Sequence, residues 1–70
     1  MTLRQIRAAA DLTQAQLGRL AGLDQTTVSQ LERGVIRDPQ VSTVRALSRA
    51  LDKSPADIEA AIRESIKVAA

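Results

Sequence analysis

A 22-residue stretch, TQAQLGRLAGLDQTTVSQLERG at residues 13–34, constrains the fold of this chain more than any other feature. Two helical patterns meet within it, with only about three or four residues between them. Gly22 stands where the chain has to turn sharply, and glycine adopts positive φ angles at little cost. Gly18 is small where the two helices would approach most closely. Apolar residues for the inner faces recur at Leu17, Ala21, Leu23, Val28 and Leu31. The stretch therefore predicts two short helices that cross steeply at a tight turn.

Helical patterns also account for the rest of the chain, and no segment shows the alternating β-branched residues that predict a strand. The T-x-x-Q sequences at Thr2 and Thr13 are capping boxes, Asp24 is a capping residue, and Ser54 followed by Pro55 is a typical helix start. The end of the chain, from Val68 onward, is expected to fray. We therefore predict one all-α domain over residues 1–70, with helices at about 3–10, 14–21, 25–33, 41–51 and 55–66.

The composition removes several classes of chemistry. The chain has no cysteine and no histidine, so disulfides, thiolate metal sites and the commonest general base are all missing. We expect no catalytic residues, no metal site and no cofactor. The chain has no aromatic residue either, which counts against an RNA or single-strand binder that stacks bases. No apolar run approaches the roughly 20 residues of a membrane span, and no signal-peptide pattern is present. We therefore expect a cytoplasmic protein without a membrane partner.

The excess positive charge lies in the first half of the chain. Residues 1–37 contain five arginines and three acidic residues, a net charge of +2, whereas residues 38–70 contain five basic and five acidic residues, a net charge of 0. Eight of the ten basic residues are arginine, which binds phosphate and guanine in a bidentate manner better than lysine does. The half with the two crossing helices is thus the half suited to an anionic partner.

The outer face of the second crossing helix is unusually neutral. A solvated helix typically shows lysine, arginine and glutamate in pairs, but this face shows only amides and hydroxyls: Gln25, Thr26, Thr27, Ser29 and Gln30. Such groups both donate and accept hydrogen bonds, which suits the base edges in a DNA groove. A solvated polar face with no ligand is the alternative interpretation.

Five sequence motifs, taken in order and with their spacing, resemble the lambdoid phage repressors and Cro proteins, the XRE family of helix-turn-helix proteins. They span about Leu3 to Ile58 and read LRQIR, LTQAQL, GLD, VSQLERG and ALSRALDKSP. The resemblance implies a compact five-helix lambda-repressor-like domain with its helix-turn-helix at about residues 14–33. It also implies that the third helix binds the major groove of double-stranded DNA. The sequence departs from the family at Gly18, where alanine is usual, and at Asp38, where a neutral or basic residue is commoner.

The residues and the resemblance together assign roles to individual side chains. The predicted base contacts are Gln25, Thr26, Thr27 and Gln30. The predicted phosphate contacts are Gln14, Arg19, Ser29, Arg33 and Arg37. The alternative for each of these arginines is a solvated surface charge. Gln14 begins its helix, where free backbone N–H groups and the helix dipole attract an anion. By the resemblance, Arg7 and Glu32 form a partly buried ion pair that joins the first helix to the third.

The fifth helix provides a candidate surface for a second copy of the chain. Proteins of this kind gain specificity by reading two half-sites about 34 Å apart, which requires a dimer. Ile62 and Ile66 lie beyond the usual domain boundary and would be exposed on a single chain. We predict a dimer interface of Ile62, Ser65 and Ile66, with Val35 and Ile36 as contributors. The alternative is that this helix folds back and covers the domain's own core.

These predictions converge on a sequence-specific transcriptional regulator, either Cro-like or similar to a controller of a restriction–modification system. It would bind a palindromic operator as a homodimer and, at this size, without a small-molecule ligand. The alternative is an antitoxin that binds its own operator and also a toxin protein. A module that binds only proteins is a further alternative, because a fold does not dictate function. No set of residues supports an enzyme.

Overall fold

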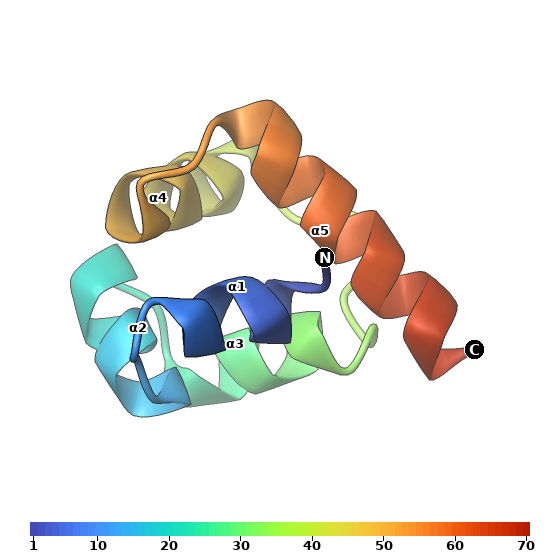
Figure 1. Ribbon diagram of the computed structural model, residues 1–70, viewed down its shortest axis with the longest axis horizontal. Coiled ribbons are helices and arrows are strands. Elements are labelled where there is room, and N and C mark those ends of the chain that lie inside the picture. Colours follow the sequence, from blue (N-terminus) through green and yellow to red (C-terminus); the bar gives the residue numbers. More distant parts are fainter.

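Five helices and no strand make up the computed structural model, which describes all 70 residues. The helices are α1 (Leu3–Ala9), α2 (Gln14–Ala21), α3 (Gln25–Glu32), α4 (Val41–Leu51) and α5 (Pro55–Ala69). Figure 1 shows α1, α2 and α3 together on one side of the molecule, with α4 above them and α5 running down beside α1 and the end of α3. The predicted all-α domain of five helices, of the lambda-repressor-like kind, is confirmed.

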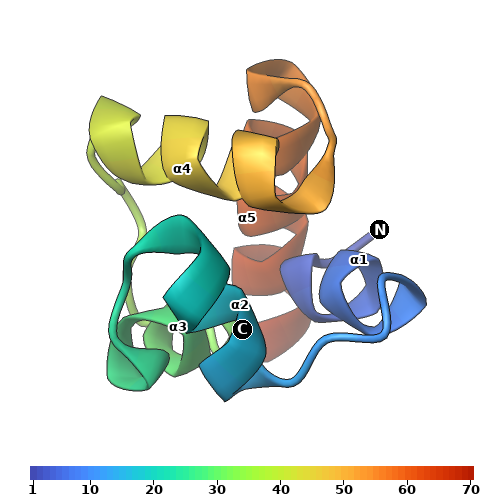
Figure 2. The same cartoon turned by 90° about the vertical axis from the view of Figure 1, so that its left-hand side faces the viewer.

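The core is aliphatic and receives side chains from every helix. α2 packs against α3 and α4, while α5 packs against α1, α3 and α4 and so closes the bundle (Figure 2). Eleven apolar side chains are buried between the helices: Leu3, Ile6, Leu17, Val28, Leu31, Val44, Leu47, Leu51, Ile58, Ala61 and Ile62. Leucine, isoleucine and valine therefore fill an interior that other small domains often build around aromatic rings.

The predicted start signals act as expected at three of the helices. Thr2 and Thr13 each accept a hydrogen bond from the backbone three residues ahead, and the glutamine at that position accepts one in return, at 2.8–3.2 Å. Ser54 Oγ accepts from the backbone N of Asp57 at 3.1 Å. Asp24 differs, because it stands at the N-cap position of α3 without a side-chain cap hydrogen bond. The start of α3 therefore has no side-chain cap, unlike the starts of α1, α2 and α5.

The helix ends depart slightly from the predicted positions. α1 and α3 end one residue earlier than predicted, and α5 ends three residues later. The chain leaves α3 through Gly34, whose φ of 75° is a left-handed conformation that glycine accepts readily. A Cβ atom on Gly34 would lie 3.1 Å from both Ala69 Cβ and Ile66 Cα. The last turn of α5 therefore packs directly on this segment, and α5 is helical through Ala69, within the part of the chain where fraying was expected.

α5 folds against the domain's own core, which corrects the prediction for this helix. Ile62 and Ser65 are each 2% exposed, and Ile66 is half-buried against the core. Ser65 Oγ accepts a hydrogen bond from the backbone N of Leu3 at 3.0 Å and donates one to the carbonyl of Ala61 at 2.8 Å. Ile62 and Ser65 are thus unavailable to a second copy, and the alternative that α5 covers the core is correct. The physical reason is that so short a chain needs every apolar side chain for its own interior.

Candidate nucleic-acid interface

Two glycines shape the turn between α2 and α3. Gly22 adopts a φ of 70°, in the left-handed region, and donates its N–H to the carbonyl of Gly18 at the end of α2. Leu23 donates to the same carbonyl at 2.8 Å, and its half-buried side chain packs against the core. A Cβ atom on Gly18 would lie only 2.6 Å from the carbonyl oxygen of Leu23. The predicted positive φ at Gly22 and the predicted close approach at Gly18 are both confirmed.

α3 has one apolar and one polar face, as its sequence pattern predicts. Val28 and Leu31 are fully buried in the core. Gln25 and Thr26 are exposed in the first turn, and three polar side chains further along are half-buried: Thr27, Ser29 and Gln30. None of these five polar side chains has a hydrogen-bond partner within the chain. In Figure 1, α3 runs along the lower edge of the molecule with its N-terminal half away from α5. α5 therefore does not mask the start of this polar face.

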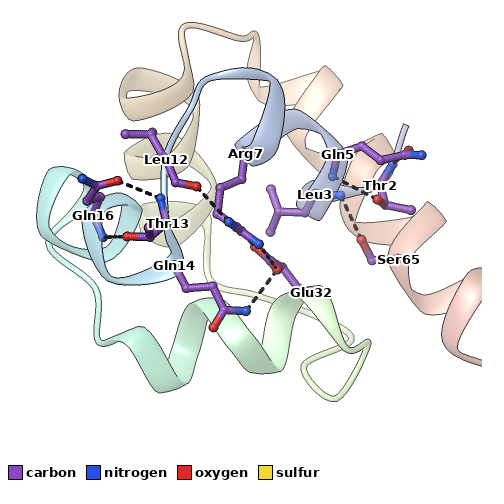
Figure 3. A network of polar contacts seen from close by, with 10 residues as sticks. All are labelled: Thr2, Leu3, Gln5, Arg7, Leu12, Thr13, Gln14, Gln16, Glu32 and Ser65. Atoms are coloured by element: carbon purple, nitrogen blue, oxygen red, sulfur yellow. Dashed lines mark hydrogen bonds and ion pairs between the residues drawn. The ribbon is translucent and has the colours of Figure 1, made fainter.

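A polar network joins α1, α2 and α3 (Figure 3). Arg7 Nε donates to Glu32 Oε2 at 2.5 Å, and Arg7 Nη2 donates to Glu32 Oε1 at 3.1 Å, so the predicted ion pair forms with bidentate geometry. Arg7 Nη1 donates to the carbonyl of Leu12 at 2.8 Å. The side chains of Arg7 and Glu32 are 14% and 4% exposed. The hydrogen bond to Glu32 raises the pKa of Arg7 above its usual value, although burial opposes this shift. Arg7 therefore stays charged wherever the domain is folded.

Gln14 belongs to the same network, through a contact that sequence reasoning missed. Its Nε2 donates to Glu32 Oε1 at 3.1 Å, and the side chain is half-buried at the first position of α2. The backbone N–H groups of Gln14 and Ala15 have no acceptor within the chain, as is usual for the first turn of a helix. No local signal could have revealed the contact with Glu32, because the two residues meet only when α2 and α3 cross.

Three further arginines that were predicted to bind phosphates are exposed: Arg19, Arg33 and Arg37. Arg19 lies in the last turn of α2, Arg33 caps the end of α3, and Arg37 lies in the loop before α4. The pair of Arg7 and Glu32 is the only salt bridge in the chain. These three guanidinium groups therefore have no carboxylate that competes with an external anion.

The acidic residues do not form a metal site, and the helices do not form a membrane span. No group of three or more carboxylate side chains is arranged so that it could hold a metal ion. None of the five helices is both long and apolar enough to span a bilayer.

Comparisons with known proteins agree with this geometry. A helix-turn-helix family model matches residues 3–58, which include α1 to α4 and the start of α5. A protein of Mycobacterium tuberculosis (strain ATCC 25618 / H37Rv) described as "Putative antitoxin HigA2" is 47% identical over 49 residues. The match covers 70% of this chain and 48% of the relative, so the chain spans about half the length of that curated protein. No solved structure matches the chain significantly.

Proposed function

Since the chain belongs to the helix-turn-helix family, we propose that it is a sequence-specific transcriptional regulator that places α3 in the major groove of double-stranded DNA. The observation that carries the proposal is the neutral outer face of α3, whose hydrogen-bonding groups have no partners inside the domain. A helix fits the major groove, where each base pair presents a distinct set of donors and acceptors. Amides and hydroxyls can both donate to and accept from such edges.

The proposed base contacts are Gln25, Thr26, Thr27 and Gln30. Gln25 and Thr26 are exposed in the first turn of α3, the part of a recognition helix that reaches the base edges. A glutamine amide pairs with N6 and N7 of adenine, and a threonine methyl group packs against the methyl group of thymine. Gln30 lies five residues after Gln25, which extends the readable surface by about 7.5 Å along the helix.

The proposed phosphate contacts are Gln14, Arg19, Ser29, Arg33 and Arg37. Gln14 would bind together with the free backbone N–H groups of the first turn of α2, where the helix dipole favours an anion. The three arginines are exposed and unpaired, so they can neutralise phosphate charge. Each neutralised phosphate should make log K fall by about 0.9 per unit of log salt concentration.

A second copy of the chain is the proposed partner on a palindromic operator, through a revised contact surface. Because Ile62 and Ser65 lie inside the domain, the proposed surface moves to the end of α5, where Val68 is 68% exposed and Ile66 is half-buried. Val35 is 59% exposed in the loop whose first residues pack under this last turn. Covering these apolar side chains in a two-fold contact would be favourable, by about 25 cal/mol per Å² buried.

An antitoxin is the second candidate function, and the Mycobacterium tuberculosis relative is the observation that favours it. In this case the chain would bind operator DNA through the same face of α3 and a toxin protein through another surface. An antitoxin should co-purify with a small partner protein in a fixed ratio when the two neighbouring genes are expressed together. A regulator that acts alone should show no such partner.

Footprinting on the DNA that flanks the protein's own gene, together with selection from random duplexes, tests the proposed function. We expect one protected site with two symmetric halves about one helical turn, roughly 34 Å, apart. A single protected half-site would argue for binding as a monomer. The regulator proposal fails if no site is protected and no duplex sequence is enriched.

A further inference from the structure

We infer that Glu32 is a positioning residue for DNA binding, which fixes the Gln14 side chain so that one amide N–H faces a phosphate. The inference rests on the proposed function and gives Glu32 a task beyond its ion pair with Arg7. The carboxylate does not touch DNA in this arrangement; it acts through Gln14. The key observation is that Glu32 Oε1 accepts hydrogen bonds from both Arg7 Nη2 and Gln14 Nε2, each at 3.1 Å.

The hydrogen bond determines which end of the Gln14 amide is held in place. An amide has an accepting oxygen and a nitrogen with two N–H groups, whereas an ionised carboxylate can only accept. The carboxylate of Glu32 must therefore meet the nitrogen, as Figure 3 shows. One N–H of Gln14 is directed at Glu32, and the second remains available to a phosphate. A freely rotating amide would present its oxygen, which a phosphate repels, as readily as its nitrogen.

Arg7 makes a carboxylate tolerable beside a phosphate. An unpaired glutamate at this place would repel the DNA backbone, but Arg7 offsets the charge of Glu32 at 2.5 and 3.1 Å. Glu32 is 4% exposed, so water competes little for its oxygens and the arrangement is rigid. Arg7 also binds the carbonyl of Leu12, in the loop that leads into α2. The network therefore restrains both the backbone before α2 and the first side chain of that helix.

A double-mutant cycle on DNA binding tests the inference. The variant Arg7→Met/Glu32→Leu removes the carboxylate together with its charge partner, a replacement that proteins with buried ion pairs often tolerate. In the unmodified chain, Gln14→Ala should weaken binding to the specific duplex about five-fold, because one good hydrogen bond is lost. In the Arg7→Met/Glu32→Leu background, the same substitution should weaken binding less than about two-fold. Equal losses in the two backgrounds would overturn the positioning role.

The side-chain amide resonances in NMR spectra show directly whether Glu32 holds the Gln14 amide. If Glu32 served only its ion pair with Arg7, the Gln14 amide would behave as a free one. In the unmodified chain, the two Nε2 protons of Gln14 should resonate far apart and exchange slowly with water. Gln40 stands at the N-cap position before α4, where its side chain makes no cap hydrogen bond, and provides the internal reference for a free amide. Glu32→Gln, which keeps an accepting oxygen but loses the charge, should move the Gln14 signals part of the way toward this reference. A Gln14 amide that already behaves like Gln40 in the unmodified chain would contradict the inference.

The positioning role and the proposed function fail in different ways. If no duplex is bound specifically, the regulator proposal is overturned and the role of Glu32 with it. If the duplex is bound and Gln14→Ala has no effect, both the phosphate contact of Gln14 and the role of Glu32 are wrong, while DNA binding stands. If Gln14→Ala weakens binding equally with and without Glu32, only the positioning role is overturned.

Discussion

Gly18 and Gly22 lie four residues apart, yet the turn between α2 and α3 needs each for a different reason. Gly22 has a φ of 70°, and a Cβ atom there would meet nothing within 4 Å, so the requirement is conformational. Gly18 is helical, and a Cβ atom there would lie 2.6 Å from the carbonyl oxygen of Leu23, so the requirement is space. In the family, alanine is usual at the position of Gly18. Here the backbone of Leu23 lies too close for an alanine Cβ atom, which accounts for the glycine.

Both alanine substitutions should destabilise the domain. Gly22→Ala should cost about 1–2 kcal/mol, because a Cβ atom in the left-handed region approaches the following carbonyl. Gly18→Ala should cost about 1–3 kcal/mol, because the backbone at Leu23 has to shift, even though alanine is favoured in helices by about 0.5–1 kcal/mol. Urea unfolding followed by circular dichroism measures both losses. Gly22→Asn is the control and should lose less than Gly22→Ala, and a Gly18→Ala variant more stable than the original chain would show that the turn relaxes freely.

Side chains that contact bases should differ from side chains that contact phosphates in their effect on specificity. Gln30→Ala should weaken binding to the operator by about 1–3 kcal/mol and relax the preference at one base pair. Arg37→Ala should weaken binding to all duplexes alike and reduce the slope of log K against log salt by about 0.9. Fluorescence titration with the operator, single-base variants and random duplexes at several salt concentrations separates the two. Equal losses on specific and random DNA for both variants would mean that the proposed contacts are assigned wrongly.

Among the elements, α5 contacts both the first residue of α1 and the segment that directly follows α3. Ser65 Oγ binds the backbone N of Leu3, the first residue of α1, at 3.0 Å. The last turn of α5 packs on Gly34, directly after α3. The residues beyond the family match therefore belong to the folded domain, since they fix the two ends of the helices that carry the proposed interface.

Ser65→Ala should destabilise the domain by about 1–3 kcal/mol, because the buried N–H of Leu3 loses its only acceptor. Thermal unfolding monitored by circular dichroism measures the loss. Ser42→Ala is the matched control, because Ser42 is exposed in the first turn of α4 and should change the stability by less than about 0.5 kcal/mol. Similar melting temperatures for the two variants would show that another group or water satisfies Leu3.

For the molecule as a whole, stability and self-association depend on different parts of α5. Ile62 is 2% exposed in a core to which all five helices contribute. Val68, six residues or about one and two-thirds turns further along the same helix, is 68% exposed. The inner residue should therefore govern folding of one chain, and the outer residue should govern contact between two chains.

Ile62→Ala should lower the free energy of unfolding by about 2–5 kcal/mol, because it leaves a cavity in a closely packed core. Val68→Asp should leave the fold intact and shift the chain toward the monomer, because it places a charge in the proposed contact between copies. Sedimentation equilibrium over a range of concentrations, combined with urea unfolding, measures both effects. An original chain that stays monomeric at high micromolar concentration would rule out the homodimer through this surface.

Much of the fold and part of the candidate interface could be predicted from the sequence, because the signals act over short distances. The capping boxes at Thr2 and Thr13, the start at Ser54 and the turn at Gly22 depend on hydrogen bonds or φ angles within about five residues. The range of α2 agrees with the predicted one for this reason, because Thr13 caps its start and Gly22 ends it. The range of α4 also agrees, although its N-cap residue Gln40 makes no side-chain hydrogen bond; the spacing of its apolar residues predicted it. The neutral outer face of α3 could also be predicted, because the spacing of the buried Val28 and Leu31 indicates which side of the helix faces outward.

Only the tertiary structure decided which helix faces meet. In the sequence, Ile62 and Ser65 belong to a pattern that fits an exposed apolar stripe as well as a buried one, and the direction in which α5 packs makes it buried. The contacts of Ser65 with Leu3 and of Gln14 with Glu32 join residues 62 and 18 positions apart. Such contacts form only when helices that are distant in sequence pack together. Burial of apolar surface drives this packing and so decides which helices become neighbours. Apolar residues that recur about every four positions predict which side of a helix is apolar. They do not predict which other helix that side will contact.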